Sequence, residues 1–101
     1  MATSQIAIGK EILRDFCVRN HITKLSLFGS VLTPRFSAYS DVDMLVEFDA
    51  QYTPSYFELV AMEIELSEAI GRKVDLRTPA ELSRYFRDEV VATALPQYER
   101  S

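Results

Sequence analysis

The sequence predicts an α/β domain built on a small mixed sheet of three or four strands, with helices packed chiefly on one face of the sheet. Three observations lead to this fold class. Residues 24–28, 41–48 and 73–77 have the length and the apolar content of strands. Longer stretches with the apolar period of a helix precede, separate and follow them. Glycine or proline stands between most of these elements, as is typical of turns and helix ends.

Length and composition narrow the classes of protein further. The chain of 101 residues suffices for one compact domain with a modest core, so residues 1–101 are expected to form a single domain. A formal net charge of −4 disfavours binding to duplex DNA through its phosphates. No apolar run approaches the roughly 20 residues of a membrane span, and residues 1–9 lack a signal-peptide pattern. No membrane contact and a cytoplasmic location are therefore expected.

The first helix is predicted over residues 4–20, ahead of the strand at residues 24–28. Its expected buried stripe consists of Ile8, Ile12, Leu13, Phe16 and Cys17. Cys17 is the single cysteine, which excludes an internal disulfide and a cysteine-based metal cluster. We interpret it as a core residue and not as a nucleophile, because no base lies next to it.

The most informative stretch lies where the first strand ends and the second begins. Asp41 and Asp43 open the second strand, and the alternation of side chains along a strand places both carboxylates on one face. Two neighbouring carboxylates repel each other unless a cation lies between them, so the pair predicts a metal site. Gly29 ends the first strand and lets the backbone pass closely around an oxygen-rich ligand. Ser30 adds a hydroxyl at an expected helix start.

The second helix is predicted to start at Thr53-Pro54, with threonine as N-cap, and to end at Gly71. Its expected buried residues are Phe57, Val60, Ala61, Ile64 and Ser67. Its expected outer face carries Glu58, Glu63 and Glu65. Residues 36–71 hold eight Asp or Glu and no Lys or Arg, which indicates either a solvated helix face with the metal ligands or a surface for a basic partner.

A third acidic position follows in the strand at residues 73–77. Val74 and Leu76 point to one face and Asp75 to the other. Thr78-Pro79-Ala80-Glu81 then has the pattern of a capping box and predicts a last helix over residues 79–95. The expected stripe of this helix is Leu82, Tyr85, Phe86, Glu89, Val90 and Ala94, and residues 97–101 are expected to fray.

Gly29-Ser30, a ten-residue spacer and Asp41-Val42-Asp43 together resemble the signature of the nucleotidyltransferases of the DNA polymerase β superfamily. The flanking strands make the chain similar to the minimal nucleotidyltransferase (MNT) proteins, which include the antitoxins of HEPN/MNT toxin–antitoxin pairs. The resemblance covers nearly the whole chain and implies a polymerase β-like fold. It also implies that Asp41, Asp43 and Asp75 hold one or two Mg²⁺ ions and carry the catalysis, with Asp75 as the general base.

The same resemblance implies that Gly29, Ser30 and Ser40 bind the nucleotide. The chain departs from the family in the loop between them, where Thr33 occupies the position of a phosphate-binding arginine. Arg35 lies two residues further on, and we predict that it supplies the positive charge near the phosphates. The implied reaction is transfer of AMP from ATP to a hydroxyl, a tyrosine of a helical HEPN-type toxin encoded nearby.

Other meanings of the Asp-x-Asp pair are disfavoured by its context. Phosphatases and sugar transferases place the pair after an apolar strand, whereas here the apolar run follows it. A calcium loop would need an oxygen ligand at Leu45 and a glycine after it. Two alternatives to an adenylylating antitoxin stay open: an antitoxin that acts by binding alone, and a small-molecule nucleotidyltransferase completed by a helical subunit. With any of these functions, a homodimeric assembly stays open as well.

Overall fold

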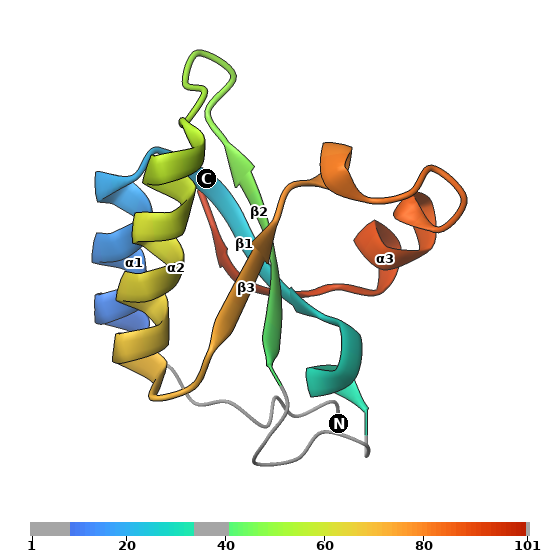
Figure 1. Cartoon of the computed structure of the whole chain (residues 1–101), viewed down its shortest axis with the longest axis horizontal. Coiled ribbons are helices and arrows are strands. Elements are labelled where there is room, and N and C mark those ends of the chain that lie inside the picture. The colour runs from blue at the N-terminus through green and yellow to red at the C-terminus, as the bar shows by residue number, and fades with distance from the viewer. Residues whose placement is uncertain (1–8, 34–40, 101) are drawn as a thin grey trace.

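The computed structural model describes residues 9–33 and 41–100 of the chain (Figure 1). Its elements follow in the order α1 (Lys10–Arg19), β1 (Ile22–Phe28), the 3-10 turn η1 (Gly29–Leu32), β2 (Val42–Phe48), α2 (Tyr56–Ile70), β3 (Val74–Arg77), the 3-10 turn η2 (Pro79–Glu81), α3 (Arg87–Thr93) and β4 (Leu95–Glu99). The strands form one sheet in the order β3-β2-β1-β4. The β2–β3 pair is parallel and the others are antiparallel, so the predicted mixed α/β fold is confirmed.

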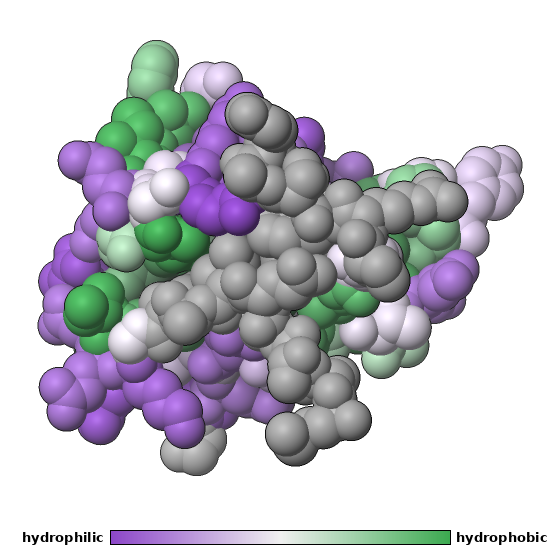
Figure 2. All heavy atoms as spheres, turned by 90° about the horizontal axis from the view of Figure 1, so that it is seen from below, coloured by the Kyte–Doolittle hydropathy of each residue, from purple (hydrophilic) through white to green (hydrophobic). Residues whose placement is uncertain are grey.

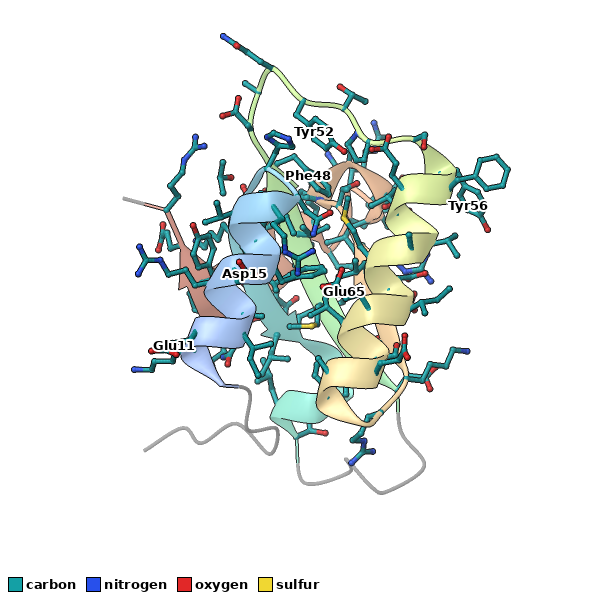
Figure 3. The ribbon with its side chains drawn as sticks, turned by 90° about the vertical axis from the view of Figure 1, so that its left-hand side faces the viewer. Glu11, Asp15, Phe48, Tyr52, Tyr56 and Glu65 are labelled. Atoms are coloured by element: carbon teal, nitrogen blue, oxygen red, sulfur yellow. The ribbon has the colours of Figure 1, made fainter. Side chains whose placement is uncertain are left out.

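Two helices cover one face of the sheet. Figure 1 shows α1 and α2 side by side on the left of the sheet, with η2 and α3 on its right. The main core lies under α1 and α2 and consists of Leu13, Phe16, Cys17, Ile22, Leu25, Leu27, Val42, Met44, Val46, Met62, Leu66, Val74 and Leu76. Figure 3 looks onto these helices, where the Arg19 guanidinium donates to the carboxylates of both Asp15 and Glu65 and so links α1 to α2.

Cys17 is fully buried in this core, as predicted, and burial raises the pKa of its thiol to about 12. We expect the folded protein not to react with a thiol reagent such as DTNB at about pH 8, because the reactive species is the thiolate. After unfolding in guanidinium chloride, one thiol per chain should react, measured by the absorbance of the released chromophore. Reaction in native buffer at the rate of a free thiol would contradict this assignment.

The opposite face of the sheet is partly covered by the C-terminal region. Leu45 on β2 and Ser26 on β1 are buried although they lie outside the main core, and Leu82 after η2 is buried as well. The 3-10 turn η2 contacts β2. This face therefore has a small buried area beside the polar residues at the start of β2.

The start of α2 differs from the prediction. Ser55, and not Thr53, is the N-cap: its hydroxyl accepts from the Glu58 backbone N–H at 3.2 Å, and the Glu58 carboxylate accepts from the Ser55 N–H at 2.9 Å. This reciprocal pair satisfies two N–H groups that the helix start leaves unpaired. The first helix was predicted from residue 4, and within the described residues α1 begins at Lys10. Ile8 of its predicted stripe lies outside the described residues.

The predicted buried stripes are also partly wrong. Phe57 is 82% exposed and Ile64 is exposed too, whereas Met62 and Leu66 are the buried residues of α2. Ile12 of α1 is likewise exposed. Apolar residues occur on almost every side of α2, so the period alone does not select its buried face.

Side chains of α2 and η2 occupy the free edge of β3, which is an outer strand of the sheet. The backbone N–H of Val74 donates to the Ser67 hydroxyl at 2.9 Å. The N–H of Leu76 donates to the Glu63 carboxylate at 2.8 Å. The N–H of Thr78 donates to the Glu81 carboxylate at 2.9 Å. The prediction that Glu63 lies on the outer face of the helix is therefore wrong, because its carboxylate accepts a hydrogen bond from β3.

The C-terminal region contains two elements where one helix was predicted. The capping pattern at Thr78 starts only the short turn η2, and α3 begins at Arg87. The predicted fraying is wrong, because β4 pairs with β1 and the Arg100 N–H donates to the Thr23 carbonyl at 2.8 Å. Without β4 the edge of β1 would lack hydrogen-bond partners. None of the helices within residues 9–33 and 41–100 has the length and apolar character needed to cross a membrane.

Candidate active site

Gly29 closes β1 in a conformation that only glycine adopts without strain. Its φ is +77°, in the left-handed region. A Cβ atom at this position would lie 2.6 Å from Oδ2 of Asp43, closer than such atoms approach. The glycine thus lets the backbone turn directly against the Asp43 carboxylate.

Asp43 and Asp75 face each other on neighbouring strands. They are register partners in the parallel β2–β3 pair, and Phe28 at the end of β1 is the antiparallel partner of Asp43. Their strand neighbours Val42 and Val74 point into the main core, so the two carboxylates lie on the opposite face. Asp41 immediately precedes β2 and is partly exposed.

The surroundings of Asp43 oppose the ionisation of its carboxyl group. Burial raises the pKa of Asp43 most, and the negative charges of Asp75 and Asp41 raise it further. The positive charge of Arg77 acts in the opposite direction. The site therefore concentrates negative charge on a half-buried group, as expected where a cation is to be held.

Among the residues that the structure describes, Lys73 and Arg77 form ion pairs with the acids. The Lys73 Nζ is 3.9 Å from Asp41 Oδ2, and the Arg77 Nη2 is 3.0 Å from Asp75 Oδ2. In the part of the chain that the structure describes, no three acidic, histidine or cysteine side chains are grouped as a ready-made metal site. Mg²⁺ is usually held by one or two carboxylates together with substrate phosphates and water, so this donor set fits that ion.

A pocket of about 200 Å³ adjoins Asp75 along the edge of β3. Leu59 and Val60 of α2 form an apolar wall. The other lining residues besides Asp75 are Tyr56, Glu63, Leu76, Arg77 and Glu81. With Asp75 the pocket holds three carboxylates, whose negative charge outweighs the single positive charge of Arg77 and disfavours a triphosphate inside it. The phosphates are better accommodated on the Gly29 side of the carboxylates, and the pocket suits an uncharged group.

Sequence reasoning missed Arg77. The available signal was its spacing of two residues from Asp75, which places both side chains on one face of β3. Of the predicted nucleotide-binding residues, Gly29 and Ser30 lie in η1. Arg35 and Ser40 lie outside the described residues.

Figure 2 views the end of the molecule at which β1 stops and β2 starts. Hydrophilic side chains line its left edge, on the side of α1 and α2, and hydrophobic ones lie both on that side and on the opposite one.

Comparisons with known proteins agree with this geometry. The family model of the nucleotidyltransferase domain matches residues 10–95. A candidate protein adenylyltransferase of Methanocaldococcus jannaschii is 36% identical over 69 residues, which are 68% of this chain and 66% of that protein. The chain thus spans just under two thirds of that relative's length.

Solved structures show the same architecture. A candidate minimal nucleotidyltransferase, 25% identical, superposes with a TM-score of 0.71 over 86% of this chain and 87% of the other. A complex of tri-AMPylated Shewanella oneidensis HEPN toxin with an MNT antitoxin matches in fold, with a TM-score of 0.63 at 21% identity over 89% of this chain and 69% of the other. The chain belongs to the nucleotidyltransferase domain family, and its fold is that of the minimal nucleotidyltransferases.

Proposed function

We propose that the protein transfers AMP from ATP to a tyrosine hydroxyl of a HEPN-type partner in a Mg²⁺-dependent reaction, and so acts as an antitoxin. One observation carries the proposal: Gly29 packs against the Asp43 carboxylate, which faces Asp75 in register on the next strand. Family membership and the AMPylated toxin of the similar complex support adenylyl transfer in particular.

Asp43 and Asp75, with Asp41 beside them, would hold Mg²⁺. When bound, the ion neutralises the triphosphate and the departing pyrophosphate and lowers the pKa of the attacking hydroxyl. The backbone N–H groups of Gly29 and Ser30 would bind phosphate oxygens, because the turn brings this backbone against the site.

The chemical step forms one bond and breaks one. The acceptor oxygen binds the α-phosphorus of ATP, the bond from that phosphorus to pyrophosphate breaks, and Asp75 accepts the proton of the hydroxyl. Asp75 is suited to this role because it lines both the site and the adjoining pocket. The apolar wall of Leu59 and Val60 in that pocket favours an aromatic acceptor over a charged one.

A protein partner fits the surroundings of the site. Asp41 is exposed and the Asp75 side chain is about one third exposed, so water reaches the reacting groups. A partner that covers this end would exclude water and orient the acceptor. Tyr56, which lines the pocket, and its chain neighbour Phe57 are exposed apolar side chains that such a partner could contact.

Labelled ATP tests the proposal. The purified protein, a HEPN-type helical protein as partner and [α-³²P]ATP are mixed with Mg²⁺, and label is expected on a tyrosine of the partner. No transfer of label is expected when EDTA is added, or when the Asp43→Ala variant replaces the wild type. A stable complex without label would establish an antitoxin that acts by binding alone, label on a small molecule would indicate the antibiotic-modifying class, and failure to bind the partner would contradict the antitoxin role.

A further inference from the structure

Arg77 is placed to contact more than the carboxylate with which it pairs. It is the last residue of β3, and the alternation of the strand places it on the face that carries Asp75. Its Nη2 lies 3.0 Å from Asp75 Oδ2, while 48% of its side chain stays exposed. The guanidinium thus has donors left for a second acceptor.

Arg77 also lies near the second carboxylate across the strand boundary. Its register partner on β2 is Leu45, two residues beyond Asp43, so Arg77 and Asp43 belong to the same face of two neighbouring strands. Arg77 is therefore close to both carboxylates that face each other. A phosphate bound between these carboxylates and Gly29 would lie within reach of a long arginine side chain.

We propose that Arg77 is a nucleotide-binding residue that exchanges partners. In the absence of nucleotide it pairs with Asp75, and when ATP enters it binds the triphosphate and leaves Asp75 able to accept the proton of the acceptor. This inference rests on the proposed function and adds a phosphate ligand outside the loop at residues 33–35.

The energies of the two contacts favour the exchange. An exposed ion pair between arginine and a carboxylate contributes little to stability, because water and salt screen it. A triphosphate carries more negative charge than one carboxylate, and its oxygens match the two-pronged geometry of a guanidinium. Loss of the pair with Asp75 is therefore more than offset by the new contact.

The chain offers a matched control for a merely structural ion pair. Arg100 Nη1 lies 3.0 Å from Asp49 Oδ2, which is the same separation as in the Arg77–Asp75 pair. The exposed fractions of the side chains are 53% and 34%, against 48% and 32%. The Arg100–Asp49 pair lies just beyond the ends of β4 and β2, at the end of β2 opposite to Asp43.

The test compares Arg77→Met with Arg100→Met in calorimetric titrations with ATP and Mg²⁺. Arg77→Met should weaken ATP binding about 10- to 100-fold, the usual effect of losing a charged hydrogen bond, and Arg77→Lys should restore part of it. Arg100→Met should bind ATP as the wild type does, with a similar change in Tm. Titration with Mn²⁺ alone should show no loss of metal affinity in Arg77→Met, because removal of a cation does not weaken a cation site.

The outcomes separate this inference from the proposed function. If the wild type binds ATP and Arg77→Met binds it within twofold, the role of Arg77 is wrong and the proposed function stands. Equal losses in Arg77→Met and Arg100→Met, or loss of Mn²⁺ binding in Arg77→Met, would also overturn it, since either would indicate a structural effect. A wild type that does not bind ATP would overturn both.

Discussion

Replacing Asp43 with asparagine is expected to abolish AMP transfer while making the nucleotide-free protein more stable. Asp43 is half-buried, and both burial and the charges of Asp75 and Asp41 oppose its ionisation. Asparagine keeps the shape of the side chain and removes the charge, so this repulsion disappears at neutral pH. The same change removes a carboxylate ligand for Mg²⁺, without which the triphosphate is neither neutralised nor oriented.

Thermal unfolding in EDTA measures the gain in stability, and label transfer in the presence of Mg²⁺ measures the loss of activity. The Tm of Asp43→Asn should exceed that of the wild type by a few degrees, since about 1 kcal/mol shifts the Tm of a domain of this size by about 4–8 °C. Asp49→Asn is the control of opposite sign, because hydrogen bonds from the Gln51 N–H and Arg100 lower the pKa of Asp49. It should lower the Tm and leave transfer intact. A Tm of Asp43→Asn below the wild-type value would contradict the repulsion argument.

The stability difference should depend on pH in one direction. Because the folded-state pKa of Asp43 is raised, the folded protein binds this proton more tightly than the unfolded chain. The resulting stability is fully present below the ordinary carboxyl pKa of about 4 and is lost as the pH rises through the raised value. The Tm advantage of Asp43→Asn should therefore grow from about pH 4 towards neutrality. Parallel Tm curves for the two proteins would exclude Asp43 as the source.

Replacing Gly29 with alanine should reduce AMP transfer about 100-fold, far more than the loss of stability would explain. The new Cβ would lie 2.6 Å from Oδ2 of Asp43, so the carboxylate has to move. A displacement of about 1 Å in a catalytic site costs about 100-fold in rate. The backbone change alone is modest, about 1–2 kcal/mol for a non-glycine residue in the left-handed region.

Gly71 provides the matched control for this substitution. Its φ of +78° equals that of Gly29 within a degree, but nothing lies within 4 Å of a Cβ built there. Gly71→Ala should therefore lose similar stability, measured by urea unfolding, and keep full transfer activity. If Gly29→Ala also retains activity, the close approach of Gly29 to Asp43 has no catalytic role.

The parts of the fold that the sequence predicted are those that depend on local pattern. Strand alternation placed Asp43 and Asp75 on the face opposite Val42 and Val74, and the structure has them so. Their catalytic roles stay a prediction. Gly29 was recognised from its place after a strand, and its close approach to Asp43 gives a physical reason for it.

The parts that could not be predicted depend on contacts between distant segments. Leu95–Glu99 contains Pro96 and has no strand pattern, and it becomes β4 because β1 offers an unpaired edge and Tyr98 packs on the core. The buried face of α2 is selected by β3, whose Leu76 N–H binds Glu63. Propensity and period are weak guides where tertiary contacts decide.

The side chains that occupy the outer N–H groups of β3 also restrict how the molecule associates. A sheet edge with unpaired N–H and C=O groups is a template for strands of other chains, and so for amyloid-like growth. Here Ser67, Glu63 and Glu81 already accept the hydrogen bonds that an incoming strand would need from Val74, Leu76 and Thr78. At the other edge Pro96 removes one donor of β4. Recognition at the β3 edge must therefore proceed through side-chain surfaces. A helical protein docks in this way, whereas an extended peptide would need the backbone N–H groups of the strand.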